Sequence, residues 1–394
     1  MPPRTRPTPA QEPEKLNEVG TDELREWFRE WLAANADRLI PYREPEPASY
    51  EEADELHVGL LLLLAEAGWS LIGWPESIGG LGGNLVLRGV VYDELAAAGY
   101  VLPERCYPVE ILGPTLLRYA PDLAVSYLPG LITGAEMWCQ GFSEPEAGSD
   151  LASLRCRATE RPGGWVVNGQ KLWTSNAQMS TKCVLLVRTG TPESRHRGLT
   201  MLLVDMNTPG ITVNPIRSAA GANHLCEVFL DDVEVPADRL IGEVGKGWEV
   251  AMYLLQFERG MYAWMRQAVL HHRVELVRHQ MPGPPGDLEA AVLGEMYAAV
   301  STLRARTAST LSRLAAGARL GPEASIDKLL LSRAEQCVTD GARRLLHPAV
   351  ETGSGEWAAY WRSAWYFARA ATILGGVAEV QRSIVAQQLL GLPR

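Results

Sequence analysis

Residues 165–173 read WVVNGQKLW and mark the point where the residue pattern of the chain changes. Apolar and polar residues alternate there around an Asn-Gly pair, which is typical of a β-hairpin with a type I′ turn. The strand-like segments that follow are KCVLLV (182–187), GLTMLLVD (198–205), ITVNPI (211–216) and CEVFLDDVEV (226–235). Short strands separated by turn residues predict a small β-sandwich or barrel in the middle of the chain.

Both flanks of this middle segment have helical periodicity. Apolar residues recur three and four positions apart in LREWFREWLAANADRL (24–39) and in EVAMYLLQFERGMYAWMRQAVLHHRVELV (249–277). We therefore expect a mainly α protein with a central β domain. The predicted segments are a flexible N-terminal extension (1–20), an N-terminal helical domain (21–135), the β domain (136–245) and a C-terminal helical bundle (246–394).

Composition excludes several classes of protein. A net charge of −10 without a basic cluster argues against nucleic-acid binding, which needs clustered Lys and Arg. No apolar run is long enough to span a membrane and no signal peptide opens the chain, so we expect a cytoplasmic protein. No metal site is expected, because the six cysteines lack C-x-x-C spacing and the histidines lack a matching ligand set.

Two segments of the β domain are candidates for ligand contacts. QGFSEPEAGSDLASLR (140–155) contains a turn of small residues whose backbone amides can bind an anion or the polar edge of a heterocycle. It can equally be an ordinary loop in which Ser149 caps the next element. In KLWTSN (171–176), Trp173 and Ser175 lie two apart on a strand and therefore share a face, either for packing or as one wall of a site for a planar cofactor.

Four motifs in order resemble the acyl-CoA dehydrogenase family: GWPESIGGLGG (73–83), GFSEPEAGSD (141–150) with NGQKLWTSN (168–176), GEVGKGWEVAM (242–252) and GGVAEVQRSIVAQQLLGLPR (375–394). The resemblance implies an N-terminal helical domain, a middle β domain and a C-terminal four-helix bundle. It also implies FAD as cofactor, an acyl-CoA substrate, and transfer of electrons to an electron-transferring flavoprotein.

The chemistry of this family needs a carboxylate that removes the α-proton of the thioester while the β-hydride goes to flavin N5. In many relatives this Glu stands in the C-terminal loop, where the present sequence has Gly375. In another branch the base precedes an Arg on the first helix of the C-terminal bundle, and here QFERG (256–260) places Glu258 before Arg259. We therefore predict that Glu258 is the base and not an ordinary solvated helix carboxylate.

The resemblance implies further site residues, carried over position by position. The residues implied for the isoalloxazine are Gln140, Gly141, Phe142, Ser143, Trp173, Thr174 and Ser175, with Gly376 and Glu379 as flavin contacts in the C-terminal loop. The residues implied for the substrate are Ser149 on the CoA side, Gln256 against the pantetheine, and Arg259. The expected product is the trans-2-enoyl-CoA.

The sequence departs from the family pattern where other members contact the FAD of a neighbouring subunit. The R-x-x-F-G and Q-I-x-G-G-x-G segments are replaced by VELVRHQMPGPPGD (274–287) and RRLLHPAVETGSGEW (343–357), and Val377 replaces the usual Thr. In this the chain resembles the base-carrying subunit of the α2β2 acyl-CoA dehydrogenases that act on steroid side-chain thioesters in actinobacteria. A homo- or hetero-oligomer with a homologous subunit is expected.

Two alternatives to a dehydrogenase that carries its own base remain. One is a catalytically silent subunit that completes the flavin site of a partner. The other is a flavin monooxygenase or a thioester desulfinase on the same fold, although such relatives generally lack a carboxylate at both base positions. The acyl chain cannot be read from the sequence, and branched or steroid side-chain thioesters are compatible with it only by analogy.

Overall fold

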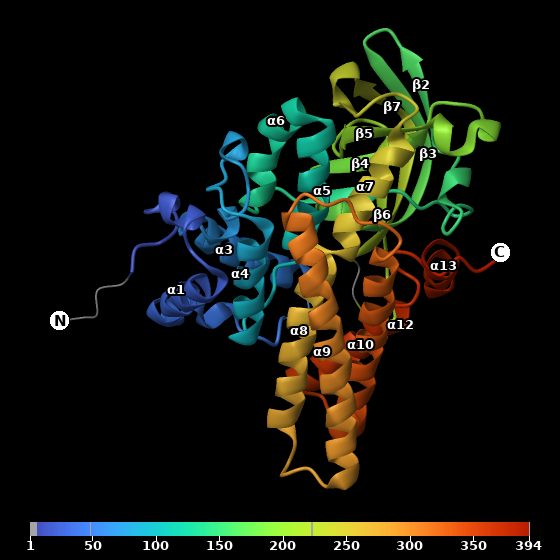
Figure 1. The fold of residues 1–394 in the computed structure, drawn as a ribbon. Helices are drawn as coiled ribbons and strands as arrows, with labels where there is room; N and C mark the ends of the chain where they lie inside the picture. Colours follow the sequence, from blue (N-terminus) through green and yellow to red (C-terminus); the bar gives the residue numbers. More distant parts are fainter. Residues whose placement is uncertain (1–5, 48, 222–223, 394) are drawn as a thin grey trace. The chain divides into compact units, whose positions relative to one another are not determined.

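The computed structural model describes residues 6–47, 49–221 and 224–393, and it confirms the predicted fold class, mainly helical with a central β domain (Figure 1). The chain forms two compact units: a helical unit (Met1–Glu104 with Glu258–Arg394) and a sheet unit (Arg105–Phe257). The helices of the helical unit are α1 (Thr21–Ala34), α2 (Ala36–Leu39), α3 (Tyr50–Glu66), α4 (Leu85–Ala97), α8 (Met261–Gln280), α9 (Asp287–Ala315), α10 (Ala324–Leu345), α11 (Ala349–Thr352), α12 (Glu356–Ala370) and α13 (Ala378–Ile384).

The sheet unit contains two helices and the strands of the β domain. Its elements are α5 (Cys106–Tyr119), α6 (Pro121–Ile132), β1 (Trp138–Gly141), β2 (Arg157–Arg161), β3 (Gly164–Ser175), β4 (Lys182–Arg188), β5 (Leu199–Asp205), β6 (Ile211–Ile216), β7 (Leu225–Pro236) and β8 (Leu240–Ile241). Helix α7 (Gly247–Arg259) begins in this unit and ends in the other. The helices that we expected in one N-terminal domain thus divide between the two units, and the predicted domain boundaries stay a prediction.

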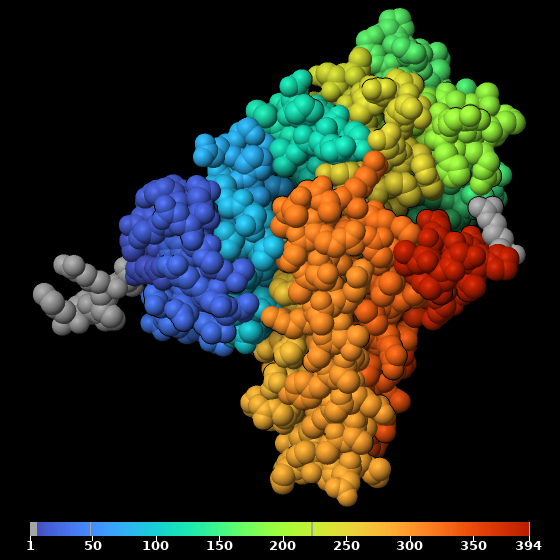
Figure 2. Space-filling model, viewed as in Figure 1, coloured from blue at the N-terminus to red at the C-terminus, as the bar shows by residue number. Residues whose placement is uncertain are grey.

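The C-terminal helices α8, α9, α10 and α12 form the predicted bundle, in which they lie side by side (Figure 1). Their shared core includes Val277, Leu303, Val338 and Trp361, one from each helix. Helix α4 is buried along most of its length, and its buried carboxylates Asp93 and Glu94 form ion pairs with arginines of α1 and α9. The segment after α12, in red in Figure 2, forms part of the surface of the helical unit and exposes Leu390 and Leu392.

The strands form one sheet in the order β6-β7-β3-β2-β4-β5-β8, and β1 pairs with β4. The β1–β4 and β2–β4 pairs are parallel and the other pairs are antiparallel. Strand β4 is buried from end to end. Helix α6 lies against this sheet, where Lys182 and Arg239 are 4.6 and 4.7 Å from the ring centre of Tyr127.

The Asn168–Gly169 pair is not the turn of a hairpin, so that prediction was wrong. Strand β3 continues through it, and the register shift opposite β7 shows a bulge at this point. Asn168 and Asp232 hold the bulge by two hydrogen bonds of 2.9 Å. A β-carbon on Gly169 would lie 2.7 Å from Cys156 Cα, so the glycine is required by a close backbone approach and not by a turn. The turn between β2 and β3 is at Gly163, which has φ +90°.

The N-terminal segment is packed, contrary to the flexible extension that we predicted for residues 1–20. Leu16 is buried, the Trp27 indole donates to the carbonyl of Pro7 at 2.6 Å, and the backbone N–H of Ala10 donates to Ala67 at 3.2 Å. These contacts, together with the ion pair between Arg6 and Glu23, hold the described part of this segment against its neighbours, which its Pro-rich composition did not indicate. The first five residues lie outside the described part of the chain.

Other expectations concern membranes, cysteines and metals. Among the described residues no helix has the length and apolar character needed to cross a bilayer, and the cytoplasmic location stays a prediction. The six cysteines are free, and all but Cys337 are buried. Within residues 6–47, 49–221 and 224–393 no group of His, Cys, Asp and Glu side chains is arranged to hold a metal ion.

A buried cluster of titratable groups lies between the loop before α3 and helices α8 and α12. The Glu44 side chain is 7% exposed, accepts a hydrogen bond of 3.0 Å from the Tyr360 hydroxyl, and lies 3.5 Å from His272 Nε2. Arg273 donates to the same hydroxyl at 2.9 Å. Burial raises the pKa of Glu44 to about 7 and lowers the pKa of His272 to about 4. The folded state therefore favours neutral His272 near neutrality, and it keeps Glu44 protonated to a higher pH than in the unfolded chain.

We expect Glu44→Gln to stabilise the protein at pH 8. The pKa of Glu44 is higher in the folded than in the unfolded chain, so its contribution to stability falls as the pH rises from about 4.5 through about 7. The glutamine removes this penalty, which amounts to about 3 kcal/mol above pH 7, and the gain vanishes near pH 4.5. Urea unfolding at pH 5 and pH 8 measures it.

The matched control for this substitution is Glu46→Gln. The pKa of Glu46 is lowered by its hydrogen bond with His57 against the opposing effect of burial, so this substitution should destabilise the protein at pH 8. A Glu44→Gln variant that loses equal stability at pH 5 and at pH 8 would contradict the raised pKa of Glu44 in the folded chain.

Candidate active site

Glu258 and Arg259 lie in the last turn of α7, immediately before a break in the helix. The sequence predicted one continuous helix here, but the backbone of Gly260 has φ −96° and ψ −86°, and α8 starts at Met261. A carboxylate at a helix C-terminus faces the negative end of the helix dipole, which disfavours its charge. The position of Glu258 therefore contributes to making it a better proton acceptor.

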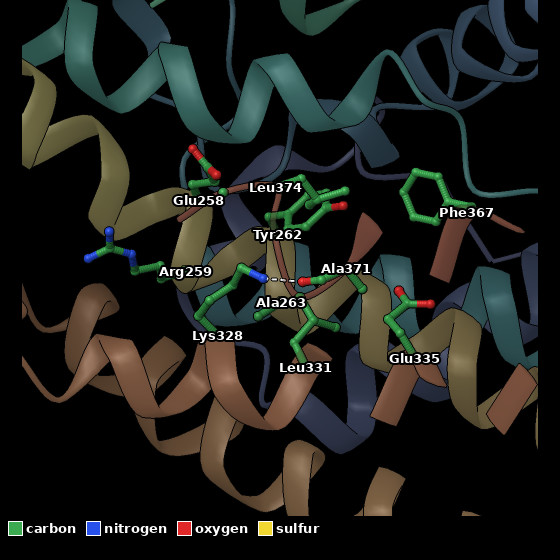
Figure 3. Close-up of a pocket in the computed structure, with 11 residues that line it drawn as sticks. Glu258, Arg259, Tyr262, Ala263, Lys328, Leu331, Glu335, Phe367, Ala371 and Leu374 are labelled. Atoms are coloured by element: carbon green, nitrogen blue, oxygen red, sulfur yellow. Dashed lines mark hydrogen bonds between the residues drawn. The ribbon is translucent and has the colours of Figure 1, made fainter. Parts of the chain in front are cut away.

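Glu258 forms one end of a pocket in the helical unit (Figure 3). The pocket is built by the end of α7, the start of α8, the inner face of α10 and the end of α12 with the turn that follows it. Its lining residues are Glu258, Arg259, Tyr262, Ala263, Lys328, Leu331, Glu335, Phe367, Ala371, Leu374 and Gly375. The unfilled space is about 20 Å3, which is room for about one water molecule.

The two family positions for the base converge on the same space. Gly375 has φ +65°, and a β-carbon placed on it would lie 2.6 Å from Glu258 Oε1 and 3.5 Å from Lys328 Cε. A side chain at position 375 would therefore collide with the carboxyl group of Glu258. A glycine at this position is what allows Glu258 to place its carboxyl group in the pocket.

Burial raises the pKa of Glu258, while the neighbouring cations Arg259 and Lys328 lower it. Burial in turn lowers the pKa of Lys328 to about 8. Arg259 Nε is buried and has no hydrogen-bond partner among the described residues, so it can donate to a bound ligand. A raised carboxyl pKa and a spare donor suit proton abstraction next to a polarised carbonyl.

In the sheet unit, the predicted flavin residues 140–143 lie at the end of β1. A β-carbon on Gly141 would lie 2.7 Å from Leu185 Cδ1, so no larger residue fits there. The backbone N–H of Leu172 donates to the carbonyl of Ser143 at 2.9 Å. This bond ties the loop after β1 to the strand that carries Trp173.

Trp173 is presented by a strained stretch of β3. It has φ +62°, and the register with β7 is interrupted between Lys171 and Thr174. Its side chain is 55% exposed and Ser175 is also exposed, so the two share a face as predicted. Strained backbone that presents a large exposed aromatic ring is typical of ligand sites, and it fits the planar ring of a flavin.

Thr174 does not share this face. Its side chain is buried and borders a small cavity inside the sheet unit together with Gly141 and Cys183, and its hydroxyl has no partner among the described residues. Only the backbone of Thr174 is therefore available to a ligand on the Trp173 side. Thr174 follows the left-handed Trp173, where the register with β7 is interrupted, so the regular alternation of a strand does not continue through this stretch.

The remaining predicted site residues are spread over both units. Ser149 is exposed in the loop before Asp150, which pairs with Arg195 at 2.6 Å, and Gln256 is buried on α7. Gly376 has φ +106°, next to Gly375. Glu379 turns to the surface, where it pairs with Arg382 at 3.2 Å. Within the helical unit the structure thus brings Glu258, Arg259 and Gly375 together, but not the Glu379 carboxylate.

Sequence reasoning missed a buried ion pair that shapes the loop of residues 142–156. The Lys171 side chain is fully buried and donates to Glu144 Oε1 at 2.8 Å and to the carbonyl of Phe142 at 3.1 Å. Glu144 also accepts the backbone N–H groups of Arg155 and Cys156 at 2.6 and 2.9 Å. Lys171 lies at a position of β3 whose side chain points into the protein. A charged residue at such a position indicates that an oppositely charged or polar partner is buried next to it.

Sequence reasoning also missed Lys328 and Glu335 as site residues, although their spacing indicates that they share one face of a helix. They lie seven residues apart on α10 and therefore share a helix face with apolar Leu331. Charged residues on a buried helix face need partners or a ligand. Both line the pocket that contains Glu258.

The sequence matches family models for the N-terminal (residues 19–135), middle (139–233) and C-terminal (245–390) domains of acyl-CoA dehydrogenases. The chain is 36% identical to acyl-CoA dehydrogenase IpdE1 of Mycobacterium tuberculosis over 382 residues, covering 95% of this chain and 98% of that protein. These matches extend over nearly the whole chain.

Solved structures of the same family are similar in fold. The "Tcur3481-Tcur3483 steroid ACAD" has a TM-score of 0.77 and 26% identity, covering 97% of this chain and 99% of that one. A chain of the ChsE4-ChsE5 complex from Mycobacterium tuberculosis has a TM-score of 0.76 and 25% identity, covering 97% and 98%. The chain therefore belongs to the acyl-CoA dehydrogenase family, whose members are FAD-dependent oxidoreductases.

Proposed function

We propose that this chain catalyses the α,β-dehydrogenation of an acyl-CoA thioester to the trans-2-enoyl-CoA, with Glu258 as the base that takes the α-proton. The observation that carries the proposal is the placement of the Glu258 carboxyl group in the space beside Gly375, where other family members have their base. No other carboxylate takes that place among the described residues that line the pocket, since Glu335 lies two helical turns along α10 from Lys328.

The reaction requires two C–H bonds of the acyl chain to break. Glu258 accepts the α-proton, the electron pair of that bond forms the new double bond, and the β-hydrogen leaves with its own electron pair. FAD, when bound, supplies the acceptor for that hydride. The residues that would hold it are Gln140, Gly141, Phe142, Ser143, Trp173, Ser175, the backbone of Thr174, and Gly376. Arg259 Nε is a candidate donor to the substrate.

The pocket leaves little room for water beside the base. Tyr262, Leu331, Phe367 and Leu374 surround a space of about 20 Å3, which is much smaller than an acyl chain. Side chains of the pocket must therefore move when the substrate binds. Expulsion of water then strengthens the interaction between the base and the acidic α-hydrogen.

A steroid-derived or branched acyl group is the proposed substrate class. The supporting observation is the similarity to a solved "steroid ACAD". An electron-transferring flavoprotein is the proposed electron acceptor, by analogy with the family.

A homologous partner chain is proposed to complete the FAD site. The sequence lacks the R-x-x-F-G segment in which an Arg would pair with the FAD pyrophosphate, and such charge-assisted bonds are stronger than neutral ones. The similar ChsE4-ChsE5 structure is a complex of two named chains. Exposed apolar side chains on the C-terminal segment, among them Ile373, Leu390 and Leu392, are compatible with a protein interface.

Glu258→Gln should reduce the formation of enoyl-CoA by about 100-fold or more, because an amide cannot accept the α-proton. Bound FAD should remain unchanged. The measurement is turnover of the FAD-loaded assembly with an artificial electron acceptor. Glu249→Gln, an exposed position on the same helix, is the matched control and should keep its activity. Full activity of Glu258→Gln would favour a catalytically silent subunit or a different flavin reaction.

The acidic limb of the pH profile of kcat/KM should report a pKa above 4.5, since burial raises the pKa of Glu258. Activity is lost as the pH falls through this pKa, because the protonated carboxyl group cannot act as a base. Arg259→Gln removes a neighbouring positive charge and should move the limb to higher pH. Arg259→Lys keeps the charge and should leave the limb in place, and equal shifts in both variants would argue against an electrostatic effect.

The chain expressed alone should bind less than one FAD per chain, and co-expression with a homologous subunit should restore full occupancy. The reason is the missing pyrophosphate contact described above. The measurement is the ratio of flavin to protein absorbance after gel filtration. Stoichiometric FAD in the isolated chain would contradict the need for a partner and leave the role of Glu258 intact.

A further inference from the structure

Helix α10 brings two buried charged side chains to the pocket, and the proposed reaction uses neither of them. Lys328 and Glu335 lie seven residues apart and are 5% and 2% exposed. In Figure 3 the amine of Lys328 lies between Glu258 at one end of the pocket and Glu335 at the other. A pocket for a plain hydrocarbon chain would have apolar side chains in these places, because buried charges cost free energy.

The Lys328 ammonium group is only partly satisfied by the protein. It donates to Ser332 Oγ at 2.8 Å and, through a short hydrogen bond, to the carbonyl of Ala371, the residue that follows α12. These two acceptors account for two of its three N–H groups. One donor is therefore left for the pocket that Lys328 lines.

Glu335 is also only partly satisfied by the protein, in its case as a hydrogen-bond acceptor. Its Oε1 atom accepts a hydrogen bond from Arg266 Nε at 2.7 Å and forms an ion pair with a terminal nitrogen of Arg266, also at 2.7 Å. Its Oε2 atom is buried and has no hydrogen-bond partner among the described residues. Buried carboxylate oxygens are rarely left without a partner, and each one found calls for an explanation.

We infer that this end of the pocket binds an oxygen-bearing part of the acyl chain, so that the substrates are hydroxy- or ketoacyl-CoA thioesters and not plain hydrocarbon ones. A hydroxyl or keto oxygen accepts the free N–H of Lys328, and a hydroxyl group donates to Glu335 Oε2. Lys328 and Glu335 are thus specificity-determining residues. This inference rests on the proposed function of the same pocket.

A purely structural role explains only half of these contacts. Lys328 does hold the end of α12, and Glu335 does neutralise Arg266. Neither role requires an unused hydrogen-bonding atom on each side chain in the wall of the pocket. A hydrocarbon chain entering there would leave both atoms without hydrogen-bond partners, whereas a hydroxyl group can pair both of them and a keto oxygen can pair the Lys328 donor.

The test compares two acyl-CoA thioesters of equal chain length, one with a hydroxyl or keto group beyond the β-carbon and one without. With the FAD-loaded assembly, kcat/KM should be about 10-fold or more higher for the oxygenated substrate. Lys328→Met and Glu335→Gln should each reduce this ratio toward one. Arg333→Met, at an exposed position on the same helix outside the pocket lining, should keep the ratio.

The ratio separates this inference from the proposed function. Any effect of Lys328 on the base acts on both substrates and cancels in the ratio. Equal rates of wild-type protein with both substrates would overturn the inference while the dehydrogenase function stands. Oxidation of neither substrate would overturn the proposed function itself. If a variant fails to fold, the wild-type ratio alone still decides.

Discussion

The shared space between Glu258 and Gly375 is the constraint on which the proposed site depends. A β-carbon at position 375 would come within 2.6 Å of the Glu258 carboxyl oxygen, so a side chain there requires the Glu258 carboxyl group to move from its present place. The Glu258 carboxyl group is placed beside Gly375 by the end of α7, by the break at Gly260 and by the left-handed backbone of Gly375. The base is therefore a property of two segments that are more than one hundred residues apart.

Both units place functional loops by means of buried charges. In the helical unit, Lys328 holds the residue that follows α12, close to the glycine pair beside the base. In the sheet unit, the Lys171–Glu144 pair holds the loop that starts at Phe142, and Arg188 donates to carbonyl oxygens of Ala152 and Leu154 at 2.6 and 2.8 Å. Such pairs are costly to bury but fix a geometry once their hydrogen bonds are complete.

The sequence predicted the architecture well because its periodicities are local. Trp173 and Ser175 are both exposed, in agreement with the shared face predicted for them, while the assignment of Glu258 as the base stays a proposal. Local sequence patterns gave wrong or incomplete predictions where contacts with a distant segment of the chain determine the structure. The backbone of Cys156 makes Asn168–Gly169 a bulge, and contacts with other segments hold the described N-terminal residues. The partners of Lys171 and Glu335, and one of the two acceptors of Lys328, lie on other elements.

The most direct test of the shared space is to move the carboxylate from position 258 to position 375. The account predicts that Glu258→Ala is inactive, that Gly375→Glu alone is destabilised by the collision, and that the double variant Glu258→Ala/Gly375→Glu regains part of the lost dehydrogenase activity. Recovery will be incomplete, because a non-glycine residue at φ +65° is strained. A Gly375→Glu variant with unchanged stability and activity, or a double variant no better than Glu258→Ala, would contradict the account.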